Sequence, residues 1–130
     1  MARSANNTVL DALLDYISAN GSQMDVCSTE PTTYAEATST YTLANTTLAT
    51  GDSGGSDYTA PQDDTSGRKL IVEQQTDIAI TGTDDAEHIA ITNGSDELIF
   101  VTTCTLQGLT SGGTVTVPAF EINVQDPVAP

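Results

Sequence analysis

The chain has 130 residues and a net charge of −15, from 18 acidic residues against only three cations, Arg3, Arg68 and Lys69. This length fits one domain with one core. Nucleic acids and anionic membranes both attract clustered Lys and Arg, so this charge excludes both as partners. No window approaches the roughly 20 apolar residues of a membrane span. Asp11 and Asp15 interrupt the N-terminal apolar stretch, so we expect no secretion signal and synthesis in a cytoplasm.

Residues 7–19 predict one amphipathic helix, because apolar side chains recur along one face. This face comprises Leu10, Leu13, Leu14 and Ile17. Asn7 or Thr8 is the expected N-cap, and Gly21 is expected to end the helix in the left-handed conformation. The apolar face has two possible roles, packing on the chain's own sheet or docking on a neighbouring subunit.

Residues 22–130 predict an antiparallel β-sandwich, jelly-roll-like, of about seven or eight strands. We therefore divide the chain into an N-terminal helix with its cap (1–21) and a β-domain (22–130). Two short strands are expected at 23–29 and 41–48. The segment from Lys69 to Val124 carries the rest, because apolar residues alternate there and turn residues recur every eight to twelve positions or so.

Two details of that segment predict how its strands are placed. Residues 98–106 are apolar on both faces, with Leu98, Phe100, Thr102, Cys104 and Leu106 on one of them. This pattern is typical of a central strand. The alternation changes parity at Pro118-Ala119, which indicates a β-bulge or a corner between two sheets.

A long loop and an extended tail complete the chain. Residues 50–68 are rich in Gly, Ser, Asp and Pro and predict a loop that Tyr58 anchors; long loops in small domains are usually functional. Residues 125–130 predict an extended C-terminal tail. The candidate contacts to a partner are Leu10, Leu13, Leu14, Ile17, Tyr58, Pro127 and Val128.

The residues give no convincing catalytic set. The sequence GDSGG at 51–55 resembles the nucleophile signature of chymotrypsin-like proteases, but that mechanism needs a His base and an orienting Asp near the Ser. The only histidine, His88, follows Ser53 in the chain, whereas that family places its His first. We therefore interpret 51–55 as a Gly/Ser loop and His88 as a surface or sheet-edge residue, and we expect no enzyme.

Cysteine and carboxylate patterns predict no cofactor. Cys27 and Cys104 form no CxxC motif, and no His cluster accompanies them, so a zinc site is not expected. Cytoplasmic synthesis favours free thiols, with a disulfide within or between chains as the alternative. Acidic residues crowd the loop at 52–64 and the turn at 84–85 without the spacing of an EF-hand, so solvated loops are the default and a structural divalent cation remains possible.

Four segments together resemble a group of small tailed-bacteriophage proteins. They are TEPTTYAEA (29–37), TSGRKLIVEQQ (65–75), ITGTDDAEHIAITNGSDELIFVTTCT (80–105) and TSGGTVTVPAFEINVQDP (110–127). The matching positions are Pro31, Tyr34, Ala37, Gly67, Arg68, His88, Pro118, Phe120, Asp126 and Pro127. Residues 82–86 depart from the pattern by being more acidic. The group lies among virion genes, and none of its motifs is catalytic.

The resemblance implies a non-enzymatic structural protein of the virion. It would decorate or cement the capsid through repeated contacts, with the major capsid protein or neck proteins of the same virion as partners and with itself in an oligomer or symmetric array. The alternatives are a neck or collar component, or a carbohydrate- or receptor-binding module of a tail or spike. Sugar sites usually present exposed aromatic rings beside carboxylates, and aromatic residues are only 5% of this chain.

Overall fold

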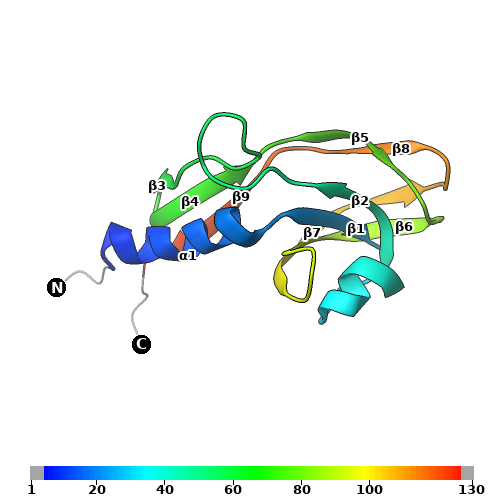
Figure 1. Ribbon diagram of the computed structural model, residues 1–130, viewed down its shortest axis with the longest axis horizontal. Helices are drawn as coiled ribbons and strands as arrows, with labels where there is room; N and C mark the ends of the chain where they lie inside the picture. Colours follow the sequence, from blue (N-terminus) through cyan, green and yellow to red (C-terminus); the bar gives the residue numbers. More distant parts are fainter. Residues whose placement is uncertain (1–4, 127–130) are drawn as a thin grey trace.

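The computed structural model describes residues 5–126, and these form a mainly antiparallel β fold with one N-terminal α-helix (Figure 1). This confirms the predicted fold class. The strands number nine in the described chain, against the seven or eight expected. The elements are α1 Asn7–Asn20, β1 Gln23–Cys27, the π-helical turn η1 Glu36–Thr40, β2 Thr42–Thr47, β3 Gln62–Asp64, β4 Gly67–Val72, β5 Gln75–Ala79, β6 Asp84–Thr92, β7 Leu98–Leu109, β8 Thr114–Val117 and β9 Phe120–Gln125. Within 5–126, no helix is long and apolar enough to cross a membrane.

The strands form two layers. One layer is a four-stranded sheet in the order β2-β1-β6-β7. The other is a long ribbon in which β4 pairs with β9 and β5 pairs with β8, with β3 added at the edge of β4. Pairing stops at Pro118-Ala119, between β8 and β9, because proline has no N–H to donate to a ladder. The change of parity predicted there is therefore a junction between two sheets.

The main core lies between the layers. Leu70 and Val72 of β4 point into it, and Ile71 points away, as the alternation predicts. Met24 and Val26 of β1 contribute from the opposite layer. A second, smaller apolar cluster lies on the outer face of the four-stranded sheet, where η1 covers it. This outer cluster contains Cys27, Ala37 and Ala90, with Tyr41, Leu98 and Val101 packed against it.

Helix α1 covers the ribbon beyond the end of the four-stranded sheet, against β4 and β9 (Figure 1). Asn6 is the N-cap, one residue before the expected position, and its Oδ1 accepts a hydrogen bond of 2.8 Å from the Thr8 N–H. Gly21 ends the helix as predicted but with φ −77°, so it is not left-handed. A Cβ there would lie 2.4 Å from the Tyr58 hydroxyl, so the glycine is required for close approach.

The predicted loop at 50–68 is partly strand. Residues 62–64 form β3, and β4 begins at Gly67, so the irregular part is shorter than expected. Tyr58 anchors this segment, as predicted: its side chain is 2% exposed and its hydroxyl donates a hydrogen bond of 2.6 Å to the Gly21 carbonyl.

Candidate functional site

The predicted apolar face of the helix divides between the core and the surface. Leu10 and Leu14 are 4% and 0% exposed and pack inward, with Ile17 half-buried beside the main core. The structure thus places these side chains against the chain's own ribbon, and Tyr58 is likewise inside the molecule. None of the four is free to meet a partner in this conformation. The remaining predicted contacts, Pro127 and Val128, lie outside the described residues.

Leu13 instead belongs to a second apolar stripe, which faces outward. Val9, Leu13 and Tyr16 are 58%, 55% and 50% exposed, and their spacing of four and three residues puts them on one face. We call these three residues the outer stripe of α1. The Tyr16 hydroxyl donates a hydrogen bond of 2.5 Å to Glu97 Oε1, which ties the stripe to the β6–β7 turn. Val9 and Tyr16 were not predicted as contact residues, although their helical spacing from Leu13 was a sufficient signal.

The helix is held in place by Arg68, which makes ion pairs with two carboxylates. Arg68 Nε and Nη2 donate to the two carboxylate oxygens of Asp11 at 2.7 and 3.2 Å, and Arg68 Nη1 donates to Asp63 at 2.6 Å. These bonds join α1, β3 and β4. The hydrogen bond to Asp11 first, and that to Asp63 next, raise the pKa of Arg68. The outer stripe is therefore presented on a helix fixed to the β-domain.

Strand β7 is an edge strand, so the prediction of a central strand for 98–106 is wrong. Among the described residues it pairs only with β6. Phe100, Thr102 and Cys104 face the space between the layers, but register shifts near both ends of the strand turn Leu98 toward the outer cluster and leave Leu106 58% exposed. Both faces are apolar because each covers part of a different core.

The molecule is closed along one side and open along the other. On the closed side, Ala44 of β2 bridges to Ile80, and the Leu43 carbonyl accepts hydrogen bonds from Thr81 N and Gly82 N at 2.8 and 3.2 Å. On the other side, β7 borders one layer and β8–β9 borders the other, without pairing to each other in the described chain. We call the gap between β7 and β8–β9 the open seam.

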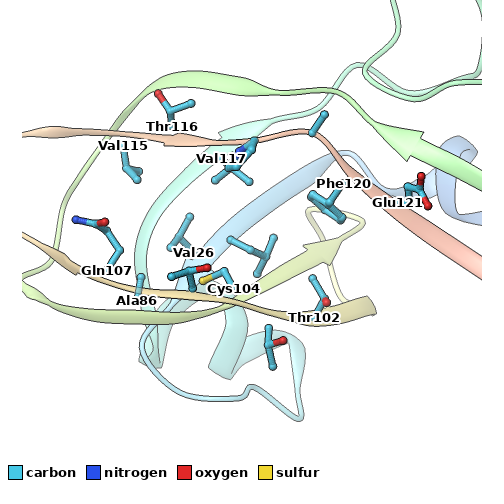
Figure 2. A pocket seen from close by; sticks show the side chains of 15 residues that line it. Val26, Ala86, Thr102, Cys104, Gln107, Val115, Thr116, Val117, Phe120 and Glu121 are labelled. Carbon is cyan, nitrogen blue, oxygen red and sulfur yellow. The ribbon is translucent and has the colours of Figure 1, made fainter.

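A groove of about 500 Å³ occupies the open seam (Figure 2). Its floor is the main core, through Val26, Ala86 and Ile89. Its walls come from β7 and from the segment 115–121. A volume of this size lies in the range of about 300–1,000 Å³ that binding sites commonly have.

The two walls differ in charge from the rest of the molecule. Residues 98–109 and 113–120 contain no charged side chain, although the chain carries 18 acidic residues. Carboxylates stand at the borders of the groove instead. Glu121, at the end of the 115–121 wall, is the one charged residue among those that line the groove (Figure 2). Glu97 precedes β7, and Glu87 lies near enough to Cys104 to be a cause, after burial, of the raised pKa of that thiol. The site is therefore an uncharged strand-lined groove with an acidic border.

Cys27 of the outer cluster has a histidine and a carboxylate beside it, but the thiol is in a state that opposes nucleophilic chemistry. Burial raises the pKa of Cys27 to about 12, with Asp25 as a further cause, so the thiol stays protonated at neutral pH. His88 is paired in register with Cys27, and its Nδ1 is buried without a hydrogen-bond partner among the described residues. Burial also raises the pKa of Asp25, which accepts hydrogen bonds from Gln23 and Thr42 at 2.8 and 2.7 Å. Both cysteines are free thiols.

The acidic loops organise their own backbone. Asp57 accepts hydrogen bonds from the Ala49 N–H at 2.6 Å and from Gln75 Nε2 at 3.1 Å. No three His, Cys, Asp or Glu side chains within residues 5–126 gather so that they could hold a metal ion. In the GDSGG segment, the Ser53 carbonyl accepts from the Ser56 hydroxyl at 2.7 Å, which makes this segment a local turn.

Comparisons of the chain with protein-family models, with curated proteins and with solved structures found no match.

Proposed function

We propose that this chain is a non-enzymatic structural component of a tailed-phage virion, which decorates or cements the capsid through repeated protein–protein contacts. The observation that carries the proposal is the uncharged edge strand β7 beside the open seam. A long apolar edge strand presents unpaired backbone N–H and C=O groups, and proteins normally protect such an edge with charges, proline or a covering element. Residues 98–109 have no charge and no proline, so a protein partner is the natural cover.

The outer stripe of α1 supports a second contact on the same molecule. Exposed apolar side chains are unremarkable singly, but a stripe at helical spacing on a fixed helix is a docking surface for another protein. A subunit that binds neighbours through two separate surfaces suits an array imposed by a shell. The net charge of −15 keeps free copies apart before assembly.

Two alternatives remain with the same surfaces. A neck or collar component would use them to close a ring. A carbohydrate- or receptor-binding module of a tail or spike is favoured by one observation, the half-exposed ring of Tyr16 beside the carboxylate of Glu97. We rank this module below the structural role because both phenylalanines, Phe100 and Phe120, pack against the core and leave Tyr16 without a second exposed ring as a platform.

Composition of purified particles tests the proposal. Virions of the phage that encodes the chain are banded on a density gradient, and the copy number of the chain is measured by quantitative mass spectrometry against the major capsid protein. We expect a copy number that scales with the capsid subunits and is kept when the tails are removed. A copy number that corresponds to one ring of subunits per virion favours the neck or collar. Presence only in the tail fraction favours the binding module, and absence from the virion refutes all three.

A further inference from the structure

The two strands that border the open seam follow each other in the chain yet do not pair. Strands joined by a tight turn usually become neighbours in one sheet. Here the turn after Leu109 is fixed elsewhere: the Gly112 N–H donates to the Ile80 carbonyl at 2.9 Å, and Ile80 N–H donates to the Gly113 carbonyl at 3.0 Å. Consequently β7 and β8 diverge into different layers, and each keeps one edge unpaired within the described chain.

The groove between them has the shape and lining that an extended segment needs. Stacked sheets lie about 10 Å apart, roughly twice the spacing of strands within a sheet, so one extended backbone fits between the layers. Val115 and Val117 point into the groove, whereas Thr116, which also borders the groove, is exposed and points its side chain away from it (Figure 2). The walls therefore offer two things to a bound strand: backbone groups at both edges, and apolar contacts at every second position.

We propose that the open seam receives an extended segment of a partner protein, with apolar side chains at alternate positions and Lys or Arg at its ends. The uncharged walls select the apolar centre, because a charge there would be buried without a partner. The carboxylates at the borders, Glu97 and Glu87 near β7 and Glu121 at the end of the 115–121 wall, select the basic ends. That the partner is a protein of the virion rests on the proposed function; the chemistry of the segment rests on the groove alone.

The charge distinguishes such a partner from a second copy of this chain. Each copy carries −15, so two copies meeting at their seams would bring their acidic rims together. Among residues 5–126, no strand has basic ends to offer. Of the chain's three cations, Arg68 and Lys69 are neighbours on β4 and are paired with Asp11 and Glu121.

A synthetic peptide tests the seam directly. The probe is an extended peptide of alternating Val and Thr with Lys at both ends, acetylated and amidated, and titrated against the full chain by fluorescence anisotropy. The control peptide has the same composition with N-methyl groups on alternate residues, so it cannot pair with a strand edge. We expect the first to bind and the second not to bind, and binding should protect amides of 98–109 or 114–121 from hydrogen exchange.

Adjacent residues of β8 supply matched variants. Val115→Arg puts a charge into the groove, whereas Thr116→Arg adds the same charge on the side that points away. We expect Val115→Arg to weaken peptide binding by roughly tenfold or more and Thr116→Arg to change it by less than about twofold. Equal effects of the two variants, or protection of amides away from the seam, overturn the inference. So does a wild-type chain that is a dimer in solution and that Val115→Arg makes monomeric.

Assembly separates this inference from the proposed function. Phages that encode each variant are grown, and the copy number of the chain per virion is measured. Selective loss of the Val115→Arg chain supports a virion partner at the seam. Normal incorporation of both variants overturns the seam inference and leaves the structural role standing. Absence of the wild-type chain from virions refutes the structural role, while the peptide titration still decides the chemistry of the groove.

Discussion

Leu13 and Leu14 are neighbours on α1 with opposite environments, and truncating each to alanine gives a sharp test of the fold. Leu14 is 0% exposed, so Leu14→Ala removes core contacts and leaves a cavity, which costs about 2–5 kcal/mol in comparable sites. Leu13 is 55% exposed, so Leu13→Ala should change the free energy of unfolding by no more than about 0.5 kcal/mol.

These free energies convert into distinct melting temperatures. A domain of this size shifts by roughly 3–5 °C per kcal/mol, so Leu14→Ala should lower Tm by roughly 6–25 °C and Leu13→Ala by less than about 2.5 °C. Thermal melts followed by far-ultraviolet circular dichroism measure both. Similar losses for the two variants would refute the assignment of the helix faces.

The same two variants distinguish an effect on stability from an effect on binding to a partner. Because Leu13 belongs to the outer stripe, Leu13→Ala should reduce incorporation into virions while Tm falls by less than about 2.5 °C. A Leu13→Ala chain that is incorporated as well as the wild type would exclude the outer stripe as a contact surface.

Three further predictions concern buried polar groups. Tyr58→Phe removes the hydroxyl that satisfies the Gly21 carbonyl, so it should lower the free energy of unfolding by about 1–3 kcal/mol in urea melts; no change would mean that another donor reaches this carbonyl. Burial raises the pKa of Asp25, so the folded chain binds this proton more tightly than the unfolded chain does. The free energy of unfolding is therefore highest below the ordinary aspartate pKa and falls as the pH rises through the raised pKa. Asp25→Asn should therefore flatten this fall in stability, and equal pH slopes for the two chains would contradict the shift. In the folded chain at pH 8, iodoacetamide should label half-buried Cys104 and leave Cys27 unmodified until the chain is denatured; rapid labelling of Cys27 would show that its thiol is not sealed.

Local patterns predicted the elements well because each depends on nearby residues. The spacing of Leu10, Leu14 and Ile17 located the helix and its buried side, and the alternation along Leu70–Val72 gave the correct inward faces. The same reasoning placed Leu13 on the wrong side, because the boundary of a buried helix face depends on the surface against which the helix packs. In this chain that surface is the ribbon, whose strands lie far from the helix in sequence.

Local sequence patterns could not predict the order of the strands in the sheets, for the same reason. Apolar residues on both faces of 98–109 are typical of a central strand, but η1 supplies a second apolar cluster on the outer face, so an edge strand acquires the same pattern. The open seam likewise depends on the fixation of the β7–β8 turn to Ile80, about 30 residues earlier in the chain. Neither contact has a signature in the residues beside it.

The order in which the chain is synthesised conflicts with the order in which its elements can pack. Helix α1 is made first, but its surface is completed by β9, and Met24 of β1 must wait for Ile91. At roughly 5–20 residues per second, the helix leaves the ribosome many seconds before its last partner strand exists. Long-range pairing of this kind folds slowly and exposes strand edges meanwhile. We expect the surplus of carboxylates to act at this stage as well, because mutual repulsion opposes pairing between unfinished copies before each can close on itself.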